Sequence, residues 1–217
     1  MPFSSMMVQM TEGFGQTVLI FVLTLVFSLP LGLLVAFCRM SKISPIRGIA
    51  KVFISILRET PLMLQLIVVF FGPFYLFNVR ISNSYRFIAI IIGFSINYSA
   101  YFAEIYRSGI QSIPKGQYEA ALVLGYSRSQ TFFKIVLPQV IKRILPAMGN
   151  EIITLVKDTS LAFVLGMAEM FSVAKALAAS NVSMIPYAIA ALIYWVFCLF
   201  IEFILGRVEK KLAYYHD

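Results

Sequence analysis

The sequence predicts an all-α integral membrane protein with five transmembrane helices, and three observations support that fold class. Of the 217 residues, 60% are hydrophobic and 13% are charged, whereas soluble domains are about half apolar and about a quarter charged. Apolar segments long enough to cross a bilayer, roughly 20 residues each, recur along the chain. The basic residues behind the net charge of +8 fall in the loops between these segments, so membrane topology explains the charge and no nucleic-acid partner is expected.

Four segments are clear candidate spans, and they cover residues 13–38, 52–77, 87–106 and 184–205. The second is interrupted near its start by Arg58 and Glu59. A weaker fifth segment, about 147–168, carries Lys157 and Asp158 near its centre. Counting this segment as a span gives five spans, and an odd number places the two termini on opposite sides of the membrane.

Basic residues decide the orientation of the chain. They crowd the first loop, the long third loop and the tail, as Arg39, Lys42, Arg47, Lys51, Arg107, Lys115, Arg128, Lys134, Lys142, Arg143, Arg207, Lys210 and Lys211. The opposite side has only Arg80, Arg86 and Lys175. Because cytoplasmic loops carry the excess of Lys and Arg, the N-terminus is expected outside and the C-terminus in the cytoplasm. The weak span is needed, since without it the basic third loop and the basic tail would face opposite sides.

The cytoplasmic loop from about residue 107 to 146 carries the most informative motif in the chain. Its first half is the run Glu119, Ala120 and Ala121, with Gly125 after three further residues. Its second half follows after nine more residues and consists of Ile135, Val136, Leu137 and Pro138.

The same loop has the signals of two helices joined by a tight corner. A short helix is expected over residues 117–124, and Gly125 is expected to end it in the left-handed conformation that glycine adopts cheaply. Ser127 and Gln130 have the spacing of a capping box, which predicts the start of a second helix. Pro138 is expected to end or kink that second helix.

This motif, placed between the third and fourth spans, resembles the cytoplasmic signature loop of the membrane subunit of ATP-driven importers, the ABC permease family. Further stretches narrow the resemblance to the binding-protein-dependent permeases of polar amino-acid uptake, namely residues 98–121, 157–161 and 60–62 with Gln65. The chain departs from this subfamily at Glu59, where glycine is more usual, so fine substrate specificity is not carried over. The resemblance implies a type I ABC importer permease fold, with residues 1–217 forming a single transmembrane permease domain.

The resemblance also implies a role for the loop and a set of partners. In this family the loop docks on a separate ATPase subunit, so coupling to ATP hydrolysis is assigned to Glu119, Ala120, Ala121, Gly125, Ile135, Leu137 and Pro138. The implied assembly contains a second permease subunit (identical or a sister), two ABC ATPase subunits and an extracytoplasmic solute-binding protein. It would move an amino-acid substrate across the lipid of the bacterial cytoplasmic membrane.

The chain is not expected to be an enzyme or to bind a cofactor of its own. It has no Gly-x-x-x-x-Gly-Lys-Ser/Thr phosphate loop, so ATP and magnesium are expected on the partner ATPase. The only histidine is His216, which argues against a histidine-based metal site. Cys38 and Cys198 lie in apolar segments and are expected to remain buried thiols.

Polar residues within the predicted spans are candidates for the substrate pathway, because ionisable groups at membrane depth are costly. In the third span, Asn97, Tyr101, Glu104 and Ser108 follow helical spacing and share one face. In the weak span, Lys157 and Asp158 lack an oppositely charged residue three or four positions away, so their partners must come from elsewhere. The predicted pathway residues are Asn97, Tyr101, Glu104, Lys157, Asp158, Thr159 and Ser160.

Structural alternatives exist for several of these residues. Glu104 has the spacing of an ordinary ion pair with Arg107. Asp158, Thr159 and Ser160 would equally serve as polar contacts between helices. Arg58 is expected to extend its charge to the interface, and Glu169 is expected to be solvated near the end of a span.

Two other functions were weighed against an importer subunit. A self-contained channel or ion-coupled carrier would leave the signature loop without a role, and five spans are few for a carrier. An intramembrane enzyme is disfavoured because the chain contains neither a His-Glu-x-x-His nor a Gly-x-Ser-x-Gly motif.

Overall fold

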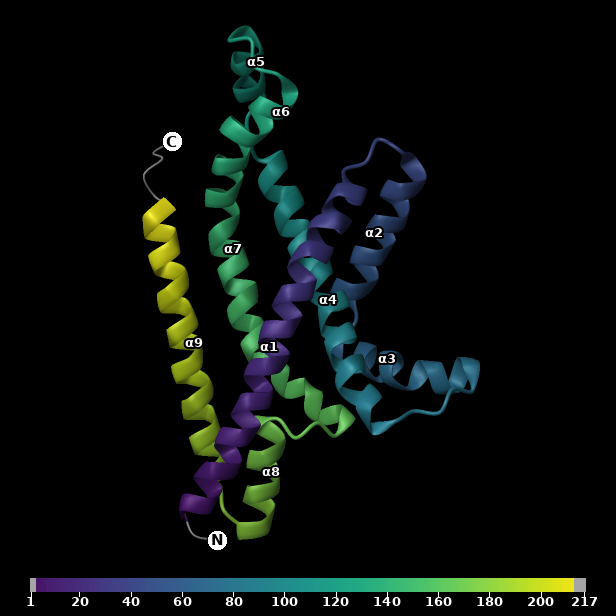
Figure 1. Ribbon diagram of the computed structural model, residues 1–217, viewed down its shortest axis with the longest axis vertical. Coiled ribbons are helices and arrows are strands. Elements are labelled where there is room, and N and C mark those ends of the chain that lie inside the picture. The colour runs from purple at the N-terminus through teal and green to yellow at the C-terminus, as the bar shows by residue number, and fades with distance from the viewer. Residues whose placement is uncertain (1–2, 213–217) are drawn as a thin grey trace.

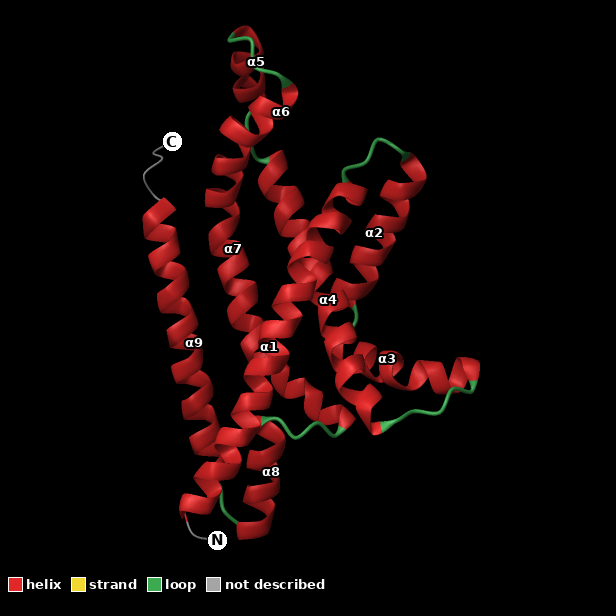
Figure 2. Ribbon diagram, in the orientation of Figure 1, coloured by secondary structure: helices red, strands yellow, loops and turns green. Residues whose placement is uncertain are grey.

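A computed structural model describes residues 3–212, and every regular element in this range is helical (Figure 2). The elements are α1 (Phe3–Arg39), α2 (Ser44–Glu59), α3 (Leu62–Phe77), α4 (Asn83–Gln111), α5 (Lys115–Val123), α6 (Arg128–Thr131), a π-helical turn (Phe132–Val136), α7 (Leu137–Asp158), a 3₁₀ helix (Thr159–Leu165), α8 (Met170–Asn181) and α9 (Ile185–Leu212). The all-α fold class is confirmed.

The long helices α1 and α4 cross at the centre of the molecule and share its most extensive helix contact (Figure 1). On one side of this pair lie α2 and α3, and on the other lie α7 and α9. The short helices α5 and α6 project at one end, whereas α8 lies at the other end, beside the start of α1. The helices therefore leave the signature loop of α5 and α6 standing clear of the bundle.

Close contact between α1 and α4 depends on a glycine. A Cβ atom on Gly32 would lie 2.9 Å from the Cβ of Phe102 and 3.0 Å from the carbonyl oxygen of Ser99. Such distances are below normal contact, so only glycine lets the two backbones approach this closely. Small residues at helix crossings are typical of membrane proteins, where packing replaces the hydrophobic effect between helices.

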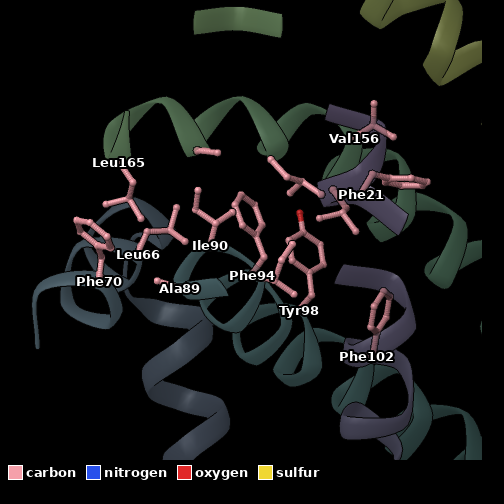
Figure 3. Packing of buried hydrophobic residues seen from close by; sticks show 14 of the residues in the cluster. Phe21, Leu66, Phe70, Ala89, Ile90, Phe94, Tyr98, Phe102, Val156 and Leu165 are labelled. Atoms are coloured by element: carbon pink, nitrogen blue, oxygen red, sulfur yellow. The ribbon is translucent and has the colours of Figure 1, made fainter. Parts of the chain in front are cut away.

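The largest core cluster joins α1, α3, α4 and α7 around Phe94 and Tyr98 (Figure 3). Within it, Leu66 of α3 is completely buried and packs over Gly93 of α4. In contrast, α9 exposes a row of large apolar side chains, namely Leu192, Trp195, Val196, Leu199, Phe200 and Phe203. An outward apolar surface of this kind is expected where lipid, not water, is the solvent.

Three of the described helices are long and apolar enough to cross a membrane, namely α1, the range 84–111 of α4, and α9. Two further pairs pass the same test only as bent pairs, so the possible number of spans is three to five. The span expected over 52–77 is not one straight helix, because α2 and α3 meet at 111° just after the expected interruption at Arg58 and Glu59. Pro61 explains the break: it lacks an N–H and pushes Thr60 out of the helical region, to φ −110 and ψ 148.

The weak span expected at about 147–168 lies within a longer element. The helical run extends from Arg128 to Leu165, and Gly166 ends it with a left-handed φ of 71. The chain then bends by 60° into α8, a helix that the sequence analysis did not predict.

Glu169 was expected to be exposed to solvent, and this prediction is wrong. Its side chain is fully buried, and its two carboxylate oxygens accept hydrogen bonds of 2.7 Å from the N–H groups of Phe171 and Ser172. The carboxylate therefore caps the start of α8, where unpaired N–H groups favour negative charge.

One of the two expectations for Pro138 was that it ends the second loop helix. This expectation is wrong. The helix instead widens into the π-helical turn, in which the N–H of Leu137 donates to the carbonyl of Phe132, and then continues as α7. Proline cannot donate to the carbonyl four residues earlier and clashes with it. The extra residue of the π-helical turn relieves this conflict without ending the helix.

Candidate functional site

The first candidate site is the corner between α5 and α6. The N–H of Gly125 donates to the carbonyl of Leu122 at 3.0 Å, and that of Tyr126 donates to Ala121 at 3.0 Å. These two bonds form the Schellman motif, which requires a left-handed residue at the position of Gly125. The φ of Gly125 is 78, so the predicted glycine cap is confirmed.

The predicted capping box starts α6. The Ser127 hydroxyl accepts from the N–H of Gln130 at 3.2 Å, and the Gln130 side chain accepts from the N–H of Ser127 at 2.9 Å. Both unpaired N–H groups are thus satisfied within four residues. The corner is built almost entirely from contacts between sequence neighbours.

The tip of this corner exposes apolar side chains that the sequence analysis did not single out. Leu122, Val123 and Leu124 are 72%, 87% and 73% exposed. In the motif itself, Glu119 and Ala120 are exposed and Ala121 is buried inside the corner. Large exposed apolar residues gathered at a projecting tip are typical of a protein-binding surface.

The second half of the motif forms the stem beneath the tip. Val136 is buried against Ile113 and Val140, while Ile135, Leu137 and Pro138 are half-buried. Arg143 of α7 also donates to the carbonyl of Ser112 at 2.6 Å. These contacts fasten the loop to α4 and α7, so a displacement of the tip would be passed on to both helices.

The second candidate site is an open hollow of about 490 Å³ between α2, α4 and α7. Its charged lining comes from Arg58 of α2, Glu104 and Arg107 of α4, and Arg143 and Glu151 of α7. Tyr101 and Ser108, both from the predicted polar face of α4, line it as well. The structure therefore brings this polar face together with charges from two other helices.

Arg58 of α2 and Glu151 of α7 place opposite charges in the lining of this hollow. The Arg58 guanidinium lies 5.3 Å from the ring centre of Tyr101, a cation–π distance. Among the described residues, no ion pair within 4.0 Å joins Arg58 to Glu151. Both charges are therefore available to a ligand in the hollow.

Asp158 has a partner outside its own helix, as its sequence context required. Its Oδ2 accepts a hydrogen bond of 2.7 Å from the hydroxyl of Tyr98 on α4. The ring of Tyr98 in turn lies 5.9 Å from that of Tyr101. Asp158 thus joins α7 to α4 close to Tyr101, which lines the hollow. This is the polar contact between helices that was the structural alternative for Asp158.

Asn97 does not lie on the open part of the polar face of α4, where Tyr101, Glu104 and Ser108 lie. It is 3% exposed, and its amide donates to the carbonyl of Leu57 at 2.9 Å and to the side chain of Gln65 at 3.0 Å. The side chain is thus inserted at the junction of α2 and α3 and does not line the hollow.

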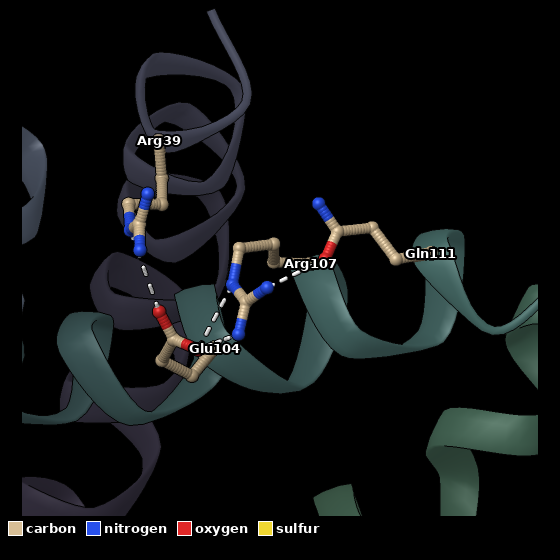
Figure 4. Close-up of polar contacts among 4 residues, drawn as sticks. All are labelled: Arg39, Glu104, Arg107 and Gln111. Atoms are coloured by element: carbon tan, nitrogen blue, oxygen red, sulfur yellow. Dashed lines mark hydrogen bonds and ion pairs between the residues drawn. The ribbon is translucent and has the colours of Figure 1, made fainter. Parts of the chain in front are cut away.

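Glu104 forms the predicted ion pair with Arg107, one helical turn away (Figure 4). Its other carboxylate oxygen lies 3.9 Å from Nε of Arg39 at the end of α1, and Arg107 also donates to Gln111. The structural alternative for Glu104 is therefore present, although the same carboxylate lines the hollow.

The remaining predicted pathway residues lie where α7 passes into the 3₁₀ helix. Lys157 is exposed and is not among the residues lining the hollow. The hydroxyls of Thr159 and Ser160 donate to the carbonyls of Val156 and Lys157, at 2.7 Å and 2.8 Å, within their own helical turn. Their role in a pathway stays a prediction.

A family comparison decides what kind of protein carries these two sites. Residues 28–214 match the model of the binding-protein-dependent transport system inner membrane component. The chain belongs to this family. It is accordingly a permease, the membrane subunit of an ABC importer and a multi-pass protein of the cytoplasmic membrane, and ATP is hydrolysed by separate subunits.

Individual relatives of the permease agree with this assignment. The chain is 36% identical to the L-cystine transport system permease protein TcyB of Bacillus subtilis, covering 95% of this chain and 87% of that one. It is 38% identical to the arginine transport system permease protein ArtQ of the same organism, covering 93% and 91%. It superposes on a crystal structure of an amino acid ABC transporter with histidines, with a TM-score of 0.87, 34% identity and coverage of 97% and 99%.

The comparisons confirm the family resemblance and, in its coarser form, the type I permease fold. The alternative of a self-contained channel or carrier is not supported, because membership implies ATPase and binding-protein partners. Sequence reasoning missed Glu151 of this permease, although a carboxylate seven residues before Asp158 shares its helix face. It also expected Arg58 only to extend its charge to the interface.

Proposed function

We propose that this permease forms half of a two-subunit pathway that imports an amino acid and that the hollow between α2, α4 and α7 receives the substrate. The observation that carries the proposal is the meeting of Arg58, Tyr101 and Glu151 in one hollow. An amino acid presents a carboxylate and an ammonium group close together. Arg58 suits the carboxylate because guanidinium groups bind carboxylates through paired hydrogen bonds.

The opposite wall supplies the complementary charge. Glu151 lines the hollow. Asp158 does not line it, but Asp158 binds the hydroxyl of Tyr98, whose ring lies beside that of Tyr101 in the lining. A carboxylate at membrane depth is costly unless it meets a cation, so these groups suit the ammonium of the substrate or a basic side chain. The proposed pathway also includes Lys157 at the end of α7 and Thr159 and Ser160 at the start of the 3₁₀ helix.

The hollow also offers a direction of travel. Its lining continues along α4 and α7 from Arg58 and Glu151 to Ser112 and Arg143, which brace the signature loop. In the proposed cycle, ATP-driven movement of the partner subunits displaces α5 and α6 and reverses which end of the pathway is open. ATP and magnesium remain on the ATPase subunits.

Docking on the ATPase is assigned to the corner itself. Leu122, Val123 and Leu124 present the apolar contact surface, beside the motif residues Glu119 and Ala120. Ala121 and Gly125 shape the corner, whereas Ile135, Leu137 and Pro138 belong to the stem that transmits its displacement. This division refines the assignment of the whole motif to docking.

The proposal is tested in proteoliposomes that contain the permease with its ATPase and binding protein. Uptake of L-cystine, L-arginine and L-glutamine, the substrates named for relatives, is measured for wild type, Arg58→Ala and Glu151→Gln. Both variants are expected to lose at least about tenfold in uptake, with a larger loss for L-arginine in Glu151→Gln. Arg47→Ala, which removes an exposed arginine from the same helix outside the hollow, is the matched control.

Wild-type uptake by correctly assembled Arg58→Ala and Glu151→Gln complexes would contradict the proposed substrate site. Failure of the wild-type complex to import any amino acid would contradict the substrate class.

We further propose five spans with the N-terminus outside, each bent helix pair counting as one span. The start of α1 and the end of α9 lie at opposite ends of the molecule (Figure 1), as an odd number of spans requires. In a background without Cys38 and Cys198, Ser129→Cys is expected to react with an impermeant thiol reagent only in opened cells. Ala179→Cys, at an exposed position of α8, is expected to react in intact cells. The reverse pattern would contradict this orientation.

A further inference from the structure

The break between α2 and α3 leaves backbone carbonyl groups in need of partners. The last carbonyls of any helix lack an intrahelical N–H, and a bilayer offers no water to replace it. At this break the 111° bend turns α3 away from the carbonyls of Leu57, Arg58 and Thr60. Arg58, the proposed carboxylate-binding residue, stands in the middle of this segment.

Two amide side chains satisfy most of these carbonyls. The Nε2 of Gln65 donates to the carbonyls of Leu57 and Thr60, at 3.0 Å and 3.1 Å, and lies 2.8 Å from the Thr60 hydroxyl. The Nδ2 of Asn97 donates to the same Leu57 carbonyl and to Oε1 of Gln65, at 2.9 Å and 3.0 Å. The amides of Asn97 and Gln65 therefore form one connected bracket across the break.

The bracket ties Arg58 to α4 from both sides of its backbone. Asn97 holds residue 57, and Tyr101, one turn later on the same face of α4, directs its hydroxyl at the carbonyl of Arg58 at 3.5 Å. The ring of Tyr101 also lies under the Arg58 guanidinium. Side chains from two successive turns of α4 thus contact the carbonyls of two successive residues at the break.

The bracket is separate from the packing that holds α3 on α4. That packing runs through Leu66, which is completely buried over Gly93, and through Phe70 and Phe94 in the core cluster. These apolar contacts remain when an amide is removed. Loss of the bracket should therefore change the direction of the break, and not the fold of the permease.

We infer that Asn97 and Gln65 are positioning residues that hold Arg58 at the substrate hollow by clamping the break between α2 and α3, an inference that rests on the proposed substrate site. Neither amide needs to touch the substrate. Affinity improves when a binding group is already held in its bound orientation, because less conformational freedom is lost on binding. The bracket would supply that orientation for Arg58.

The test is a double-mutant cycle in the reconstituted complex with its ATPase and binding protein. The probe is an equimolar mixture of L-cystine, L-arginine and L-glutamine, and the readout is the concentration giving half-maximal stimulation of ATP hydrolysis. Asn97→Ala is expected to raise that concentration at least about fivefold in the wild-type background, and to add less than about twofold when Arg58→Ala is already present. Ser95→Ala, which removes a buried hydroxyl without a hydrogen bond from the same helix, is the matched control.

An equal effect of Asn97→Ala in both backgrounds would overturn the inference, because the amide would then act independently of Arg58. No effect in the wild-type background would overturn it as well. If Arg58→Ala alone leaves the half-maximal concentration unchanged, the proposed substrate site is wrong. A second readout then tests the bracket independently of the substrate site.

That second readout is the thiol reactivity of a cysteine placed at position 58. The rate of modification of Arg58→Cys by a small impermeant thiol reagent is expected to change severalfold when Asn97→Ala is added. The rate at Val52→Cys, an exposed position on α2 before the break, is expected to stay the same. Unchanged reactivity at position 58 would show that Asn97 does not hold the break.

Discussion

The corner at Gly125 and the break at Thr60–Pro61 both turn the chain sharply between two helices, yet they are held by different means. At Gly125 the backbone bonds and the capping box join residues no more than five positions apart. At the break, the Leu57 carbonyl is bound by Asn97, 40 residues away on another helix. One corner is made by local sequence, and the other depends on tertiary structure.

This difference suits the two roles proposed for them. A corner held by its own residues keeps its shape while it moves, which is what a helix that transmits force requires. The break takes its geometry from α4, so any movement of α4 during transport also moves Arg58. A local corner and a tertiary corner should therefore fail differently when they are mutated.

The largest effect is expected from Gly125→Val. A β-branched residue at a φ of 78 costs about 1–3 kcal/mol of backbone strain, and a Cβ there adds no clash, because it meets no atom within 4 Å. Uptake in proteoliposomes should fall at least about tenfold while the complex still assembles. Gly116→Ala, in the same loop with equally open space, is the control and should transport normally.

Gly125→Asp should strain the backbone less than valine, because aspartate tolerates the left-handed region. Its remaining effect would come from a charge at the docking surface. Normal uptake by an assembled Gly125→Val complex would contradict the role of the corner.

A smaller effect is expected from Gln65→Leu, which removes the donor for two carbonyls of the break. Two hydrogen bonds are lost, one to the Leu57 carbonyl, which keeps Asn97 as a donor, and one to the Thr60 carbonyl. Each costs about 0.5–1.5 kcal/mol, so the substrate concentration for half-maximal ATPase stimulation should rise about tenfold. The maximal rate should change much less than in Gly125→Val. A Gln65→Leu complex that loses only maximal rate would contradict the proposed difference between the two corners.

Ser127→Ala should have a moderate effect confined to coupling. Loss of an N-cap hydroxyl costs about 1 kcal/mol, and the backbone bonds of the Schellman motif remain. Uptake is expected to fall about twofold to fivefold without a change in the half-maximal substrate concentration. A thermal melt of the complex serves as the control, since a general loss of stability would lower the melting temperature as well.

The smallest effect is expected from Tyr101→Phe. Its hydroxyl lies 3.5 Å from the Arg58 carbonyl, at the limit of a hydrogen bond, whereas the ring beneath the guanidinium is retained. The half-maximal substrate concentration should change less than about twofold, and Tyr101→Leu should raise it more. Equally large effects of the two variants would show that the hydroxyl, and not the ring, holds Arg58, and equally small effects would show that neither does.

Sequence reasoning succeeded where the signals were local. The glycine cap and the capping box were both predicted, because each depends on residue types a few positions apart. Asn97 was expected on an open face with Tyr101, since helical spacing gives the face of a residue but not what packs against it. Only the fold shows that the α2–α3 break approaches this helix.

The same limit explains the other differences. Pro61 lies inside the apolar segment that was counted as one span, with its interruption assigned to Arg58 and Glu59, although proline was already a sufficient reason for a break. Glu169 was expected in solvent because its partners are N–H groups of α8, a helix that the sequence analysis did not predict. Glu151 of the hollow lacked a motif, and only the fold brings it and Arg58 into the lining of the same hollow.

The most direct test is a titration of ATP hydrolysis against substrate in reconstituted wild-type, Gly125→Val and Gln65→Leu complexes. Separate roles for the two corners predict that Gly125→Val lowers the maximal stimulated rate at an unchanged half-maximal concentration, and that Gln65→Leu raises the half-maximal concentration about tenfold. The same change in both parameters for both variants would contradict this account.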